Sequence, residues 1–176
     1  SATRFLYING GYIVVNSGGD GIDINGAAEM TDGVLIVDGP AQNMNAALDF
    51  DAGFKITGGF IVATGSAGMA QAPGQTSTQA SLLVNVGSSV RAGTLVRAQT
   101  AQGKEIVTFA PTKAYQSVAI SSPDMAVGDT IDLYFGGSST GTKVDGLIEG
   151  GSYSGGTKAG SVTLSGVSTV VGGRSR

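Results

Sequence analysis

The sequence predicts an all-β fold in which a parallel β-helix with three strands per coil is followed by a β-rich cap. A phrase of three short β-type runs begins at Tyr12, begins again at Val34 and starts a third time at Phe60. Such a repeat is typical of a solenoid, whose coils stack equivalent strands about 4.8 Å apart. No stretch combines the apolar spacing of a helix with capping residues, so we expect no helices.

The corners between the runs are rich in glycine, which accounts for 30 of the 176 residues against four prolines. Glycine readily adopts the positive φ that sharp corners need. Gly11 and Gly33 are 22 residues apart, and Gly33 and Gly59 are 26 apart. The extra four residues of the second coil lie in one longer corner, residues 38–46. An insertion confined to one corner is what a solenoid tolerates.

The first run of each coil is apolar at all four of its positions, residues 12–15, 34–37 and 60–63. Tyr12, Val34 and Phe60 are predicted to stack on one side of this sheet, and the residue after each of them on the other. A sheet that is apolar on both faces must be buried on both. Either the C-terminal cap folds back over the outer face, or a second subunit covers it.

The second run places acidic side chains on the surface. Alternation turns its apolar residues inward and leaves Asp23 and Asp49 outward, as neighbours on adjacent coils. Two bare carboxylates about 5 Å apart repel by roughly 3 kcal/mol at an effective dielectric of about 20. A hard cation removes this repulsion, and calcium accepts about six to eight oxygens in loose geometry. The predicted Ca²⁺ ligands are Asp20, Asp23, Asn25, Asn45, Asp49 and Asp51. The alternative is a solvated acidic face without a bound ion.

The third run aligns Tyr7, Glu29 and Lys55 on the outside of successive coils. Glu29 and Lys55 are expected to form a surface ion pair worth under about 1 kcal/mol. The alternative is that Tyr7 and Lys55 form a carbohydrate-binding patch.

The second half of the chain has a different character. Residues 81–86 are predicted to close the third coil, and residues 94–98 pair with 105–109 as an antiparallel hairpin. Further strands are expected at residues 117–120, 130–135 and 161–164.

The domain prediction is one structural unit with two parts. Residues 1–86 form the parallel β-helix coils, and residues 87–176 form a β-rich C-terminal cap packed on them. A solenoid needs such a cap because its last coil otherwise exposes unpaired strand edges.

Composition excludes several classes of function. The net charge is −3, only 13% of residues are charged, and no basic run occurs, so we expect no nucleic-acid partner. No apolar run approaches the roughly 20 residues of a transmembrane helix, so we expect no membrane insertion.

The chain offers little for catalysis, because it has neither histidine nor cysteine. Asp23 and Asp49 are better explained as shared cation ligands than as the acid and base of a glycosidase. A lyase would need a basic residue beside calcium, and the one candidate, Lys55, faces another side of the coil. We therefore expect no enzymatic activity.

Several stretches carry a resemblance to a known family, namely residues 17–26, 45–51, 54–59, 68–73, 115–118, 121–123 and 150–153. They resemble the bacterial carbohydrate-binding domain-containing proteins of the polygalacturonate-binding β-helix type. The resemblance implies a right-handed parallel β-helix, several bound calcium ions and a secreted or cell-surface location. It also implies binding of pectic or other polysaccharide without established catalysis.

Members of that group look longer at the N-terminus, whereas this chain begins at Ser1 inside the third run of a coil. The open first coil would expose strand edges. We therefore expect either that the sequence is a fragment of a larger protein or that another segment or subunit stacks on this coil.

Together these observations predict a calcium-stabilised extracellular protein that binds acidic polysaccharide such as polygalacturonate or pectin. One alternative is a structural subunit of a cell-surface fibre or matrix. It would self-associate through the open first coil and the apolar outer face of the first strand column. The other alternative is a polysaccharide lyase.

Overall fold

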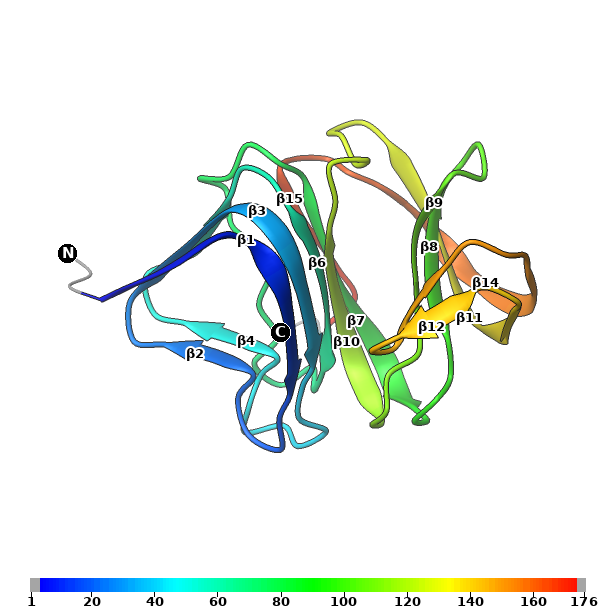
Figure 1. Cartoon of the computed structure of the whole chain (residues 1–176), viewed down its shortest axis with the longest axis horizontal. Coiled ribbons are helices and arrows are strands. Elements are labelled where there is room, and N and C mark those ends of the chain that lie inside the picture. Colours follow the sequence, from blue (N-terminus) through cyan, green and yellow to red (C-terminus); the bar gives the residue numbers. More distant parts are fainter. Residues whose placement is uncertain (1–3, 174–176) are drawn as a thin grey trace.

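The computed structural model describes residues 4–173, and all of their regular elements are strands. The predicted all-β class is confirmed. Figure 1 shows two main layers, a large curled sheet and a second sheet that faces it. None of the described residues belongs to a helix that could cross a membrane. Ser1 lies outside the described residues.

The larger sheet, here called the mixed sheet, has seven strands that run in both directions. Six of them lie in the order β1-β3-β6-β10-β7-β15, and β5 pairs with β3. In chain order the strands are β1 (Phe5–Asn16), β3 (Ala27–Asp38), β5 (Phe54–Ile56), β6 (Phe60–Gly65), β7 (Ser81–Val90), β10 (Tyr115–Ser121) and β15 (Ser168–Val171).

The facing sheet, here called the antiparallel sheet, has six strands in the order β12-β13-β9-β8-β11-β14. In chain order they are β8 (Val96–Thr100), β9 (Glu105–Phe109), β11 (Thr130–Ser139), β12 (Thr142–Val144), β13 (Leu147–Glu149) and β14 (Tyr153–Thr163). A separate pair joins β2 (Ile22–Ile24) to β4 (Leu48–Phe50).

Parallel pairing in the first 65 residues follows the sequence repeat. Strands β1, β3 and β6 lie parallel, with Tyr12 opposite Val34 and Val34 opposite Phe60. This register is the predicted one. The corner residue Gly33 has a φ of 100°, and a Cβ added there would lie 2.7 Å from the carbonyl carbon of Gly10. Only glycine fits, so this corner helps to fix the register.

The sheets beyond β6 differ from the prediction, and a continuous parallel β-helix is not shown. Residues 81–86, which we expected to close the third coil, belong to β7 and pair antiparallel with β10. Strand β10 in turn pairs antiparallel with β6. It suits this central place because Val118 and Ile120 enter one core while Ala119 enters the other. The residue-86 limit between the two predicted parts falls inside β7.

The antiparallel sheet covers the outer face of the mixed sheet. This is the first of the two predicted alternatives, in which the C-terminal part of the chain folds back over that face. Ile36 and Val62 enter a core between the sheets, together with Val96 and Ile131 of the antiparallel sheet. The predicted hairpin within this sheet is confirmed, because β8 and β9 pair antiparallel. On the opposite face, Leu35 and its equivalents enter a second core enclosed by the coils.

A buried carboxylate joins the first coils to the loop before β10. The side chain of Asp38 accepts hydrogen bonds from the backbone N–H of Thr112, at 2.6 Å, and from its hydroxyl. The neighbouring Lys113 donates to the backbone carbonyls of Ser17 and Asp38 at 2.5 and 2.6 Å. These contacts hold the C-terminal ends of β1 and β3 against the loop that precedes β10.

Candidate functional site

The predicted neighbourhood of Asp23 and Asp49 is confirmed. Strands β2 and β4 are parallel, and their register places Asp23 directly opposite Asp49. The flanking residue Leu48 is buried in the coil core, and Ile22 and Ile24 pack against it. Because successive side chains of a strand point to opposite faces, this packing turns both carboxylates outward.

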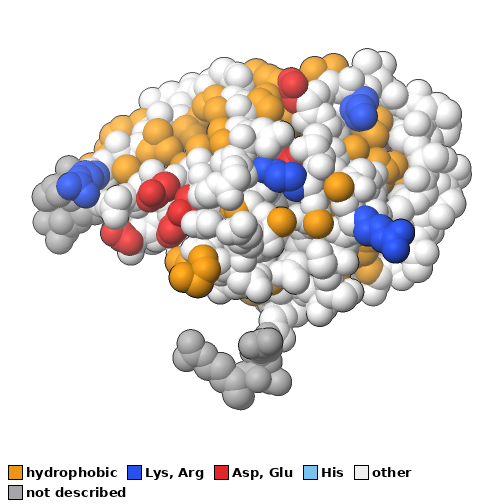
Figure 2. Space-filling view, turned by 90° about the horizontal axis from the view of Figure 1, so that it is seen from below, with side chains coloured by type: hydrophobic (Ala, Val, Ile, Leu, Met, Phe, Trp, Pro, Cys, Tyr) orange, Lys and Arg blue, Asp and Glu red, His pale blue; other side chains and the backbone are white. Residues whose placement is uncertain are grey.

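The carboxylates around Asp49 form an acidic surface. Partial burial raises the pKa of Asp49, and the charges of Asp20, Asp23 and Asp51 raise this pKa further. Figure 2 shows acidic side chains gathered on the underside of the molecule, on the side where β2 and β4 lie. The cluster therefore repels itself when all of its members are ionised.

Two of the six predicted calcium ligands brace the long corner. Asp20 Oδ1 accepts a hydrogen bond from the backbone N–H of Ala46 at 2.7 Å. With its amide nitrogen toward Asp20, Asn45 donates to Asp20 Oδ2 at 3.2 Å. The hydroxyl of Ser66 donates to the backbone carbonyl of Asn45 at 2.6 Å. Both oxygens of Asp20 are thus engaged in holding the corner.

The remaining two, Asn25 and Asp51, are exposed and lie just beyond the paired strands. The backbone N–H of Asp51 continues the ladder by donating to the carbonyl of Ile24 at 3.3 Å. Sequence reasoning missed Gln71, whose side-chain oxygen accepts from the N–H of Phe50 at 2.9 Å. Gln71 belongs to the third pass of the repeat, where its side chain replaces the partner that a further strand would supply.

The acidic surface fits an open cation site better than a closed one. Among residues 4–173, no three Asp, Glu, His or Cys side chains converge closely enough to hold a metal ion. Calcium needs about six to eight oxygens. Asp23 and Asp49 would supply a part of them, and Asn25, water or a bound ligand would supply the rest.

The third column has the predicted order. Tyr7 lies opposite Glu29, and Glu29 lies opposite Lys55. Lys55 Nζ pairs with Glu29 Oε1 at 3.2 Å, and both side chains are partly exposed. The ring of Tyr7 stacks on that of Phe5, with 5.9 Å between centroids. The Tyr7 ring is thus free to contact a ligand, while the charge of Lys55 is matched by Glu29.

Sequence reasoning also missed a groove between the two sheets. It is bordered by Val34 and Phe60 on one side and by β13 on the other, and Glu149 is one of its acidic side chains. The dipeptide Asp145-Gly146, with φ of 49° and 86°, makes the hairpin turn that presents β13. Asp-Gly between two β-type runs is a strong hairpin signal that could have revealed this wall.

Comparisons with protein-family models, curated proteins and solved structures found no match for this chain.

Replacing Asp49 by asparagine should raise stability when calcium is absent. Because the folded-state pKa of Asp49 is raised, its ionised form disfavours the fold. This cost is absent below the unfolded pKa of about 3.9 and fully present above the folded one. In chelator at neutral pH, Asp49→Asn should raise the melting temperature by up to about 2–4 °C. The gain should vanish near pH 3.

Thermal melts at both pH values provide the test. Asp124→Asn serves as the control, because it removes an exposed carboxylate that pairs with Lys104 at 2.7 Å and should bring no gain. A lower melting temperature of Asp49→Asn at neutral pH in chelator would show that the Asp49 charge stabilises the fold.

Proposed function

We propose that this chain is a non-catalytic binding protein for acidic polysaccharide, with polygalacturonate as the model ligand. The observation that carries the proposal is the outward-facing pair of carboxylates on β2 and β4, Asp23 directly opposite Asp49. Calcium bound there would neutralise both protein carboxylates and accept uronate oxygens in its remaining coordination positions. The protein supplies the preorganised pair, and the ligand completes the site.

The arrangement suits a polymer for two reasons. The absence of a three-carboxylate group among residues 4–173 leaves coordination positions for an external ligand. A polyuronate also carries carboxylates at regular intervals, so several of them can bind along one surface. Tyr7, which is exposed on β1, can contact a sugar ring with its apolar face.

We also propose that the first coils are those of a right-handed parallel β-helix and that the protein works outside the cell. Parallel pairing of β1 with β3, β3 with β6, β3 with β5 and β2 with β4 supports the helical arrangement. The absence of cysteine is compatible with either redox environment.

A lyase is less well supported than a binding protein. Lys55, the only base that we considered for it, is engaged with Glu29 at 3.2 Å. It lies on β5, whereas the acidic pair lies on β2 and β4.

Retention on immobilised polygalacturonate tests the leading proposal. We expect the protein to be retained in calcium and released by chelator. Asp23→Asn and Asp49→Asn should each weaken binding about tenfold or more, because each removes a charged ligand. Asp124→Asn, which alters an exposed carboxylate elsewhere, should leave retention unchanged. Equal retention of wild type with and without calcium, or no retention at all, would rule the proposal out.

A self-assembling subunit of a cell-surface fibre or matrix is the second candidate, and the surface of β1 favours it. Within residues 4–173 the only strand beside β1 is β3, so its other edge is free. Phe5, Tyr7, Tyr12 and Val14 on this strand are 54%, 59%, 50% and 43% exposed. A long edge strand with exposed apolar side chains is a template for pairing with another chain.

Light scattering over a range of concentrations tests this second candidate. Wild type should grow in mass with concentration, and Val14→Lys combined with Tyr7→Lys should remain monomeric, because charges on an edge strand oppose pairing. Val127→Lys, at an exposed valine away from β1, is the matched control and should associate like wild type. A wild type that stays monomeric at all concentrations would eliminate this candidate.

A further inference from the structure

The groove between the sheets has two adjoining parts. The larger part has a volume of about 490 Å³ and lies between the mixed sheet, at Val34 and Phe60, and strands β9 and β13. A smaller part of about 190 Å³ lies between Tyr12 and Val144. Leu147 and Glu149 border both parts, so the groove follows β13.

One row of side chains forms the floor of the groove. Tyr12, Val34 and Phe60 lie in register on β1, β3 and β6. Neighbouring strands are about 4.8 Å apart, so the two aromatic residues are roughly 10 Å apart. Tyr12 is half exposed because the antiparallel sheet does not fully cover β1. An apolar row with a ring at each end suits ligands that present flat, partly apolar faces.

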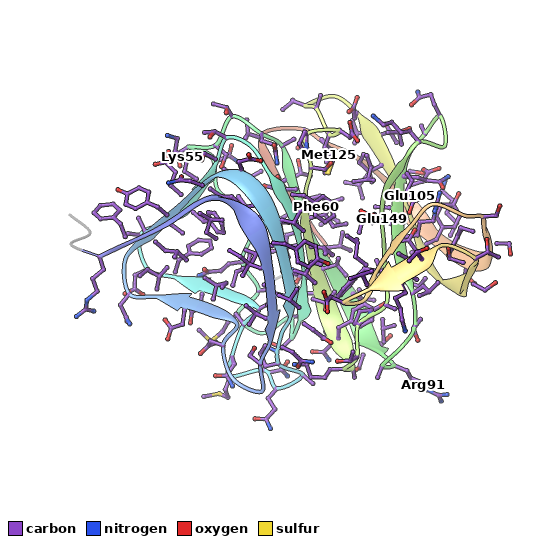
Figure 3. The ribbon with its side chains drawn as sticks, viewed as in Figure 1. Lys55, Phe60, Arg91, Glu105, Met125 and Glu149 are labelled. Atoms are coloured by element: carbon purple, nitrogen blue, oxygen red, sulfur yellow. The ribbon has the colours of Figure 1, made fainter. Side chains whose placement is uncertain are left out.

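All charged side chains that line the groove, among the described residues, are acidic. Glu105, Asp124 and Glu149 line the larger part, and no Lys or Arg among the described residues lines either part. Glu105 pairs with Arg97 at 3.0 Å, and Asp124 pairs with Lys104 at 2.7 Å. Within the described part of the chain, Glu149 has no such partner. Figure 3 shows Phe60, Glu149 and Glu105 following one another from the mixed sheet into the antiparallel sheet.

The smaller part continues this negative character, because Glu149 lines it as well. Asp145, in the turn between β12 and β13, lies close enough to Tyr12 for its charge to act on the phenol. Desolvation raises the pKa of Tyr12, and the charges of Asp145 and Glu149 raise it further. A ligand that follows the row from Phe60 to Tyr12 therefore meets the carboxylate of Glu149 in both parts of the groove.

We propose that this groove binds a short oligosaccharide that carries protonated amino groups, such as a glucosamine oligomer. The sugar rings would lie over Phe60 and Tyr12, and an ammonium group would pair with Glu149. The acidic lining favours a cationic ligand over the uronate proposed for β2 and β4. This second site needs no calcium and shares no residue with Asp23 and Asp49.

The groove offers less to a basic peptide than to a sugar. An extended peptide gains most from backbone hydrogen bonds to a free strand edge. Here the floor is the face of a sheet, where β1, β3 and β6 present side chains. The available polar groups are the carboxylate of Glu149 and the hydroxyl of Thr142, both exposed, which suit ammonium and hydroxyl groups on a ring.

Calorimetric titration with glucosamine trimer, in chelator, tests the proposal. A pH of about 6 keeps the carboxylates ionised while the sugar amines carry charge. We expect saturable binding to wild type and at least about tenfold weaker binding of the fully N-acetylated trimer, which has lost the charges. Glu149→Gln should weaken binding of the glucosamine trimer by a similar factor. Tyr12→Ala should weaken it too, through lost stacking.

Glu29→Gln is the matched control, since Glu29 faces outward on another column and should leave the affinity unchanged. Failure of wild type to bind, equal binding of the N-acetylated trimer, or full affinity in Glu149→Gln would overturn the proposal. Tighter binding of a lysine tripeptide than of the glucosamine trimer would reassign the groove to basic peptides. All of these results are obtained without calcium, so they leave the polygalacturonate proposal untouched.

Discussion

The mixed sheet carries apolar side chains on both of its faces, and the need to bury both determines the architecture. On one face, Leu35 and Ile61 are covered by the coils of their own segment. On the other, Ile36 and Val62 are covered by the antiparallel sheet. Full burial of one such side chain is worth about 1.5–3 kcal/mol. Neither half of the chain can supply both covers, so the two halves depend on each other.

Both proposed binding surfaces lie where a sheet is no longer buried on both of its faces. The pair β2 and β4 has only its inner face buried, which leaves Asp23 and Asp49 outward. At β1 the antiparallel sheet no longer covers the row that begins with Phe60, so Tyr12 is half exposed and the groove opens. The incompletely covered edge of a sheet can bind a ligand, whereas the side chains at the centre of the sheet are buried in the core.

Local sequence signals predicted the first 65 residues well, and long-range pairing was beyond them. Corner glycines and alternation place Asp23 opposite Asp49 because both signals act within one coil. Strand β7 pairs antiparallel with β10, which is distant in the chain. No local signal in either strand identifies the other as its partner. The hydrogen bond that Asn45 donates to Asp20 could not be predicted either, since it depends on how the long corner folds.

Native-state hydrogen exchange of an Ile36→Ala variant tests most directly whether the two halves of the chain, which share the mixed sheet, unfold as one cooperative unit. Truncating a buried isoleucine in this way costs about 2–5 kcal/mol. If both halves depend on the same sheet, amides of β2 and β4 should lose as much protection free energy as amides of β8 and β11. Unchanged protection in β2 and β4, with loss confined to the antiparallel sheet, would contradict this account.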